Sequence, residues 1–131
     1  MFAIIISNMA NTSKKILLVE DDAFLAMLIQ SKLQRDGFEV LISNDGPSVL
    51  PMIKKEKPAL LLLDIILPGK TGFEVLEEMS AAKIKIPFMV VSNLGQKEDL
   101  DRAEKLGTLA YFVKSKMTLE TLSSKINSFF G

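Results

Sequence analysis

The chain has 131 residues, the usual length of one domain, and its 16 basic and 16 acidic side chains leave no net charge. It contains neither cysteine nor histidine, which excludes disulfides, thiol chemistry, histidine-ligated zinc, a Ser-His-Asp triad and any phosphohistidine. Carboxylates, lysines, hydroxyls and backbone groups remain for chemistry, and the balanced charge argues against sequence-nonspecific binding of nucleic acid.

Residues 1–13 precede the first periodic element. The apolar run 2–6 is too short for the apolar part of a signal peptide, and no basic residue stands before it. We expect residues 1–13 to be an N-terminal tail, either disordered or due to an upstream start codon; an additional edge strand is the alternative. Residues 14–131 are expected to form one domain. Because no long apolar span follows, we expect a cytoplasmic protein without a membrane segment.

The rest of the sequence alternates short apolar runs with amphipathic stretches. Residues 15–20 ("KILLVE") have strand character, and residues 22–36 place apolar side chains at helical spacing (24, 25, 28, 29 and 33) before Gly37, a typical helix end. Pro51 is expected to kink or delay the second helix, and Thr118 to cap the last one. The pattern predicts further strands at 38–42, 60–63, 86–91 and 109–113, and further helices at 44–57, 71–83, 95–106 and 118–130.

Five β–α units of this kind predict an α/β domain. Strands alternating with helices imply a parallel sheet that is covered on both faces. The run 60–63, four consecutive leucines, fits a central strand because it is apolar on both faces. In helix 95–106 the predicted inward side chains are Leu100, Ala103 and Leu106; in helix 118–130 they are Leu119, Leu122, Ile126 and either Phe129 or Phe130.

Ionisable and hydroxyl side chains follow directly after several of the predicted strands. Glu20 and Asp21 follow the first strand, Asp64 the third and Lys114 the fifth, and the fourth ends at Ser92. In an open parallel sheet, ligands bind outside the carboxyl ends of the strands. We therefore expect these five residues to meet in one cleft.

Acids crowded together in this way need a counter-charge, because neighbouring carboxylates repel one another. Mg²⁺ suits a site of one or two carboxylates plus a substrate phosphate. With Glu20, Asp21 and Asp64 negative and Lys114 positive, such a cation would balance the charge. Asp64 would then be a nucleophile that forms an aspartyl phosphate, since phosphoryl transfer depends mainly on positioning and charge neutralisation.

Four motifs in this order resemble the receiver domains of response regulators in two-component signalling: "ILLVEDD", "LLLLDIILPGKTG", "VVSN" and "YFVKS". The resemblance covers residues 14–130. It implies a five-stranded, flavodoxin-like, doubly wound (βα)5 fold with the strand order 2-1-3-4-5.

The resemblance also implies a metal site and a phosphoacceptor. Glu20 and Asp21 would bind Mg²⁺, directly or through water. Asp64 would be both the phosphoacceptor and the third carboxylate ligand. The backbone carbonyl of Ile66 would complete the ligands that the protein supplies.

Three further residues match positions with a switching or catalytic role in this family. Ser92 would be the hydroxyl that moves to bind the phosphoryl group, and Lys114 the lysine paired with that group. Tyr111 would be the aromatic whose rotamer changes on activation; a half-buried strand residue is its structural alternative. Asp22 is interpreted as a helix cap rather than a ligand.

Two positions depart from the family pattern. Ser115 stands where a proline usually follows the lysine, often after a cis peptide bond. Because a cis bond before a residue other than proline costs about 3–4 kcal/mol, we expect a trans bond and a differently shaped loop. Asn93 replaces a small residue and would narrow access to the phosphoryl site.

The resulting hypothesis is a stand-alone receiver. Asp64 would take a phosphoryl group from a phosphohistidine of a sensor kinase or histidine phosphotransfer protein, and the product would act on a downstream protein or pass the phosphate on. The protein would be a monomer, or a weak dimer through the face made by the fourth helix, fifth strand and fifth helix. An unphosphorylated interaction module is the alternative. A magnesium phosphatase is disfavoured, because Ile66 stands where such enzymes carry a second acid.

Overall fold

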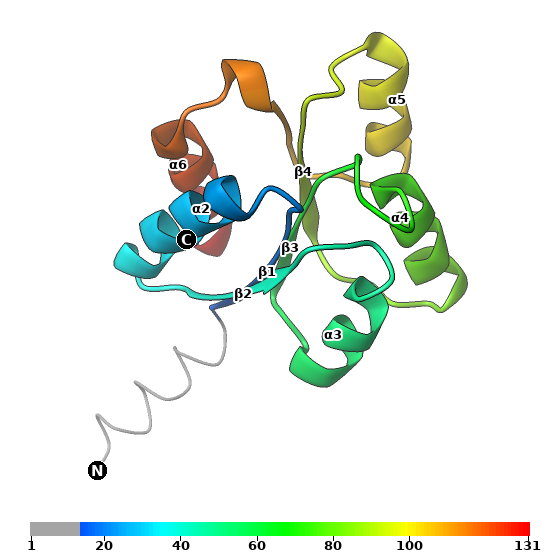
Figure 1. Cartoon of the computed structure of the whole chain (residues 1–131), viewed down its shortest axis with the longest axis horizontal. Coiled ribbons are helices and arrows are strands. Elements are labelled where there is room, and N and C mark those ends of the chain that lie inside the picture. The colour runs from blue at the N-terminus through cyan, green and yellow to red at the C-terminus, as the bar shows by residue number, and fades with distance from the viewer. Residues whose placement is uncertain (1–13) are drawn as a thin grey trace.

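A computed structural model describes residues 14–131, and it shows a central sheet with helices on both faces (Figure 1). The expected tail, residues 1–13, lies outside the described residues. All five strands are parallel, in the order β2-β1-β3-β4-β5, which confirms the predicted flavodoxin-like fold. The strands are β1 Lys15–Val19, β2 Glu39–Ser43, β3 Leu60–Leu63, β4 Phe88–Ser92 and β5 Tyr111–Val113.

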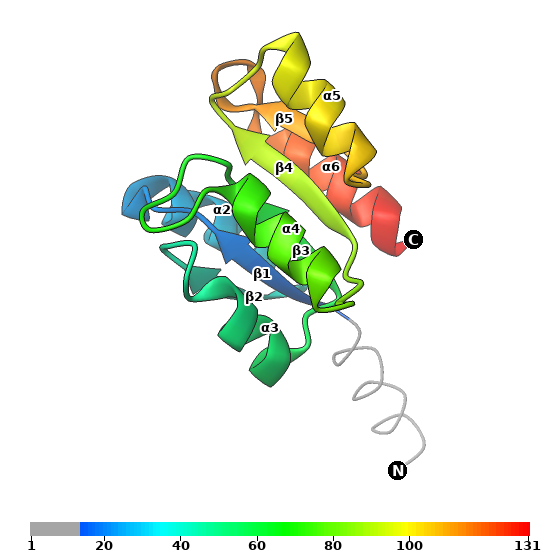
Figure 2. The same cartoon turned by 90° about the vertical axis from the view of Figure 1, so that its right-hand side faces the viewer.

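The helices divide between the two faces of the sheet. Helices α2 and α6 cover one face, and α3, α4 and α5 cover the other (Figures 1 and 2). Within residues 14–131, no helix has the length and apolar character needed to span a membrane. The helices are α2 Ala23–Arg35, α3 Val49–Glu56, α4 Gly72–Ala81, α5 Lys97–Lys105 and α6 Leu119–Phe130, with a short 3-10 helix, η1, at Lys114–Lys116.

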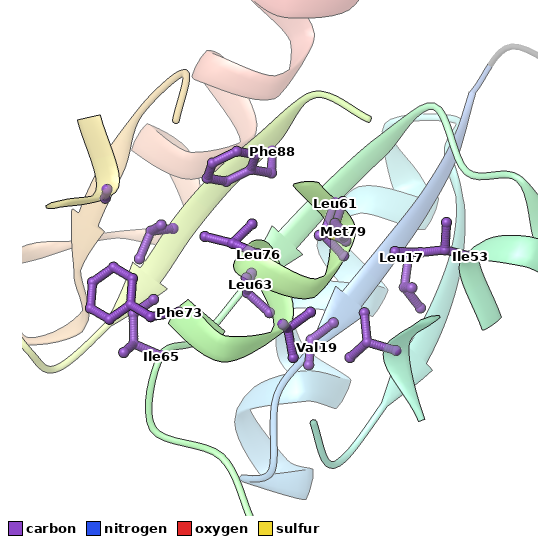
Figure 3. Close-up of a cluster of buried hydrophobic side chains, with 14 residues drawn as sticks. Leu17, Val19, Ile53, Leu61, Leu63, Ile65, Phe73, Leu76, Met79 and Phe88 are labelled. Carbon is purple, nitrogen blue, oxygen red and sulfur yellow. The ribbon is translucent and has the colours of Figure 1, made fainter. Parts of the chain in front are cut away.

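Strand β3 lies at the centre of two apolar clusters. Successive side chains of a strand point to opposite faces, so Leu61 and Leu63 pack under α3, α4 and α5 (Figure 3), while Leu60 and Leu62 pack under α2 and α6. All four leucines are fully buried. The strand is therefore fixed from both sides, and so is the position of the residue that follows it, Asp64.

Helix α2 differs from expectation in the residues that it buries. The sequence pattern places Phe24 and Leu28 on the inner face, but Phe24 is 66% exposed and Leu28 is 39% exposed. Ala26, Ile29 and Leu33 are the buried residues of this helix. They follow the i, i+3, i+7 spacing of one helical face, so the helix is rotated relative to the predicted stripe.

Proline delays helix α3 rather than kinking it. The helix begins at Val49 instead of the predicted residue 44, and Pro51 is its third residue. The first N–H groups of a helix have no partner within it. Pro51 therefore removes no helical hydrogen bond, and of the two expected effects, a kink or a delayed start, the delayed start is the one that occurs.

The last two helices follow the predicted stripes only in part. Ala103 is the buried residue of α5, whereas Leu100 is 38% exposed. In α6 the side chain of Thr118 caps the helix by accepting from the N–H of Thr121, as predicted. Of the two candidate phenylalanines, Phe130 packs against the core, while Phe129 is 39% exposed.

Candidate functional site

Three acidic residues meet at the carboxyl edge of the sheet. Glu20 and Asp21 follow β1, Asp64 follows β3, and the pairing of these two strands places Val19 beside Leu63. One carboxylate oxygen from each acid lies within 4.8 Å of the others. Glu20 is only 1% exposed and Asp64 only 3% exposed, whereas Asp21 is open to solvent. This acidic cluster therefore has a buried floor and one accessible side.

Lys114 enters the acidic cluster from the end of β5. Its Nζ lies 2.6 Å from Asp64 Oδ2 and 2.7 Å from Glu20 Oε1. Burial alone would lower the pKa of Lys114, but its hydrogen bonds to Asp64 and Glu20, together with the negative charges of these two carboxylates, outweigh burial and raise that pKa. The ammonium group is therefore held in its charged form.

One lysine does not neutralise the acidic cluster. Burial raises the pKa of Glu20, and the hydrogen bond from Lys114 offsets that effect only in part. Three carboxylates and one ammonium group leave two negative charges. An all-oxygen donor set with this charge and one open side fits Mg²⁺, which prefers a few carboxylates and keeps waters or phosphate oxygens as its other ligands.

Backbone and amide groups fix the two buried acids. The N–H of Asp22 donates to Glu20 Oε2 at 3.0 Å, and Asn44 Nδ2 donates to the Glu20 carbonyl at 3.1 Å. The N–H of Ile66 donates to Asp64 Oδ1 at 3.1 Å. Asp22 itself caps α2, in agreement with the sequence interpretation. Asn44 was not assigned to the site from sequence; its position directly after β2 is the signal that could have identified it.

The turn after Asp64 is closely packed. The side chain of Ile66 is an exception, because it is 53% exposed to solvent. The backbone carbonyl of Ile66 is predicted to bind the metal, and that role stays a prediction. Helix α4 begins so near the strand that a Cβ on Gly72 would lie 2.3 Å from the Asp64 carbonyl oxygen. Only glycine fits there, so this contact fixes the start of α4 against the phosphoacceptor candidate.

Ser92 and Tyr111 both contact Leu94 rather than the acidic cluster. Ser92 is fully buried at the end of β4, and its Oγ accepts from the Leu94 N–H at 3.3 Å. The hydroxyl of Tyr111 donates to the Leu94 carbonyl. Burial and the negative charges of Asp99 and Asp64 raise the pKa of Tyr111 to about 12. The loop after β4 thus joins the two residues for which a switching role is predicted.

The loop after β5 has the expected backbone. The peptide bond between Lys114 and Ser115 is trans, and the chain turns through the short helix η1 instead of the proline loop that is usual in the family. Ser115 and Asn93 are both exposed. The sequence indicated a differently shaped loop but not the 3-10 geometry that it takes.

Comparison with known proteins identifies the family of this chain. The family described as response regulator receiver domain matches residues 16–127. The alkaline phosphatase synthesis transcriptional regulatory protein PhoP of Bacillus subtilis is 32% identical over 102 residues, 78% of this chain and 42% of that protein. Sporulation initiation phosphotransferase F of the same organism is 28% identical over 102 residues, 78% of this chain and 82% of that protein. This chain thus spans less than half the length of PhoP.

Solved structures agree with this result. The BeF3-activated N-terminal receiver domain of Klebsiella pneumoniae RstA superposes with a TM-score of 0.80 at 27% identity, over 87% of this chain and 96% of that chain. The family match begins at the second residue of β1 and includes the other four strands and the acidic cluster that follows β1 and β3. The chain therefore belongs to the response regulator receiver domains of two-component signalling.

Proposed function

We propose that Asp64 accepts a phosphoryl group from a phosphohistidine of a sensor kinase or histidine phosphotransfer protein, in a Mg²⁺-dependent reaction. The observation that carries this proposal is the placement of the Asp64 carboxylate. It is buried at the end of the central strand, is 2.6 Å from Lys114 Nζ, and shares the acidic cluster with Glu20 and Asp21.

In the transfer, a carboxylate oxygen of Asp64 forms a bond to phosphorus as the bond from phosphorus to the donor imidazole nitrogen breaks. The nitrogen keeps the electron pair of the broken bond, so no further reactant is needed. Glu20, Asp21, Asp64 and the carbonyl of Ile66 would hold Mg²⁺, which when bound neutralises charge on the phosphoryl oxygens. Lys114 lies where its ammonium group can leave Asp64 Oδ2 and pair with a phosphoryl oxygen.

A phosphoryl group on Asp64 would also change the hydrogen bonds of Ser92. The predicted role of Ser92 is that its hydroxyl moves to donate to a phosphoryl oxygen; if that movement takes Oγ away from Leu94, the Leu94 N–H would lose its present acceptor. The loop after β4 would rearrange, and with it the bond between Tyr111 and the Leu94 carbonyl. We propose that phosphorylation is transmitted in this way to the face made by α5, β5 and α6.

Signalling would then occur through protein contacts. We propose that the α5, β5 and α6 face serves a downstream protein or a weak dimer, and that phosphate is alternatively relayed to a histidine phosphotransfer protein. Sporulation initiation phosphotransferase F, most of whose length this chain covers, is by its name a phosphotransferase, which supports the relay. The match covers only 42% of PhoP, so the transcriptional role in the name of PhoP does not support a transcriptional role for this chain.

The test uses a small phosphodonor and two matched variants. Acetyl phosphate with Mg²⁺ should add one phosphoryl group to the protein, measured by intact mass spectrometry, and chelation of the metal should prevent the addition. Asp64→Asn should abolish it. Asp22→Asn is the control, because asparagine also caps helices and Asp22 lies outside the acidic cluster.

Two outcomes would contradict the proposal. Labelling that persists in Asp64→Asn would place the phosphoryl group elsewhere. No labelling of the wild type, together with no amide shift changes near Asp64 on adding beryllofluoride and Mg²⁺, would favour the unphosphorylated interaction module.

A further inference from the structure

A groove lies between α4 and α5 at the amino edge of the sheet, opposite the acidic cluster. Both helices lie on the same face and end at the edge where the strands begin (Figure 2). The groove has a volume of about 540 Å³. Its floor is formed by Leu76, Met79 and Phe88, which are buried in the core (Figure 3), and its apolar walls by the partly exposed Ile84, Ile86 and Leu106.

Three lysines stand around this apolar surface. Lys83 and Lys85 lie in the loop between α4 and β4, and Lys105 lies across the groove in the last turn of α5. All three are exposed. In the described part of the chain, none has a carboxylate oxygen within 4.0 Å, and no acidic residue lines the groove.

Ordinary helix electrostatics explains only part of this arrangement. Lys105 lies at the end of α5, where a cation interacts favourably with the helix dipole. Lys83 and Lys85 lie beyond the last residue of α4, Ala81, and Lys83 has a φ of 59°, in the left-handed region that normally favours glycine. A lysine thus occupies a position where a glycine would be less strained.

Arg102 of α5 links the two helices beside the groove. The guanidinium group of Arg102 lies 4.3 Å from the centre of the Phe73 ring and 3.3 Å from Glu77 Oε1. Among the described residues this is the ion pair between α4 and α5, whose apolar side chains also share one buried cluster. Near the amino edge of the sheet, α4 and α5 are separated by the groove.

We propose that this groove binds an acidic segment of a partner protein, which inserts a large apolar side chain between α4 and α5 and pairs its flanking Asp or Glu residues with Lys83, Lys85 and Lys105. The volume lies within the range of pockets that hold a specific ligand, and the charge of the lysines is complementary to such a segment. The acidic cluster repels the same segment from the opposite edge. Residues 1–13 of this chain contain no acidic side chain and do not match the lysines.

This inference goes beyond the proposed function and does not depend on phosphorylation of Asp64. The probe is a short synthetic peptide with a Trp–Leu pair between two runs of glutamate. The protein contains no tryptophan, so the fluorescence of the peptide reports binding directly. We expect saturable binding, with amide shift changes confined to residues of the groove. Asp64→Asn should bind the peptide as the wild type does, which separates this test from that of the phosphoacceptor.

Charge reversal on the groove provides the decisive comparison. The double variant Lys83→Glu, Lys85→Glu should weaken binding about tenfold or more. The matched control is Lys54→Glu, Lys55→Glu on α3, which changes the net charge equally at two exposed positions outside the groove and should bind nearly as the wild type does. Replacing the Trp–Leu pair of the peptide by alanines should abolish the shift changes at the groove.

Several results would overturn the proposal. Equal weakening by both double variants would indicate nonspecific charge attraction. If a peptide with lysine in place of glutamate binds equally well, Lys83, Lys85 and Lys105 of the protein do not contribute to peptide binding. Groove amide shifts that depend on protein concentration without peptide would identify a second copy of the chain as the occupant, and shifts on deleting residues 1–13 would identify that segment.

Discussion

Glu20 and Asp64 share a single ammonium group, that of Lys114, at 2.7 and 2.6 Å. Lys114→Met keeps a long side chain but leaves two buried carboxylates without a cation. Removing one partner of a buried ion pair costs about 3 kcal/mol or more, so we expect the free energy of unfolding in metal-free buffer to fall by about that amount. Urea unfolding followed by circular dichroism measures this change.

The matched control for that variant lies two residues further on. Lys116 is exposed and, within residues 14–131, takes part in no ion pair. Lys116→Met should therefore change the free energy of unfolding by less than about 0.5 kcal/mol. If Lys114→Met is as stable as the control, the lysine does not hold the two acids together.

Tyr111 gives a spectroscopic test of the loop after β4. It is the single tyrosine of the chain, so phenolate absorbance reports its titration alone. We expect a midpoint near pH 12 in the folded protein instead of the ordinary 10.0, because burial disfavours the phenolate and Asp99 and Asp64 repel it. The raised pKa of Tyr111 stabilises the fold fully below pH 10, and this contribution is lost as the pH rises toward 12, because only the unfolded chain has released the proton.

Denaturant provides the control for the tyrosine titration. In urea the midpoint should return to about 10, the value of an exposed phenol. A midpoint of 10 in the protein while its circular dichroism is still native would show that the hydroxyl is free in solution. The hydrogen bond to Leu94 would then not be the contact through which Tyr111 senses the loop.

At the scale of elements, local sequence patterns determined most of the fold. Residues 60–63 were predicted to the residue, because four leucines in succession fit only an element buried on both faces. The rotation of α2 was not predictable, because Phe24 and Leu28 are as apolar as the side chains that are buried. The shared contact of Ser92 and Tyr111 with Leu94 was also missed, since it depends on how a loop folds back on a neighbouring strand and leaves no periodic signal.

The acidic cluster was predictable for a different reason. Parallel strands end at the same edge, so residues far apart in the chain are placed together once the topology is known. Asn44 follows β2 in the same way, yet a neutral amide at a strand end has many structural uses, and its contact with the Glu20 carbonyl required coordinates. The sequence also predicted no groove at the opposite edge, because the space between α4 and α5 depends on how the two helices diverge.

Helix α4 offers a test of how an element supports the site. Thr71 Oγ1 accepts from the Glu74 N–H at 3.1 Å, and Glu74 Oε1 accepts from the Thr71 N–H at 3.3 Å, which forms a reciprocal cap. Thr71→Ala should lower the free energy of unfolding by about 1 kcal/mol, while Thr71→Ser should keep most of the cap. Ser80→Ala, at an exposed position of the same helix, is the control. Equal unfolding midpoints for the alanine and serine variants would show that the cap adds nothing.

At the scale of the whole molecule, metal binding should be linked to folding. The acidic cluster exists only when β1 and β3 are paired, so we expect Mg²⁺ to bind the folded chain and not the unfolded one. At tenfold excess over its dissociation constant, Mg²⁺ should add about 1.4 kcal/mol to the free energy of unfolding. Thermal unfolding with increasing Mg²⁺ measures this as a rising midpoint.

Asp21 is the residue with which to test that linkage, because it is the exposed member of the acidic cluster and its replacement leaves the buried core intact. Asp21→Asn should unfold near the wild-type midpoint without metal and lose most of the Mg²⁺-dependent rise. Asp22→Asn should keep the full rise, since Asp22 serves α2 as its cap. If the rise is the same in both variants, the cation binds elsewhere on the molecule. If the wild type shows no rise at millimolar Mg²⁺, two negative charges at this edge do not create a metal site.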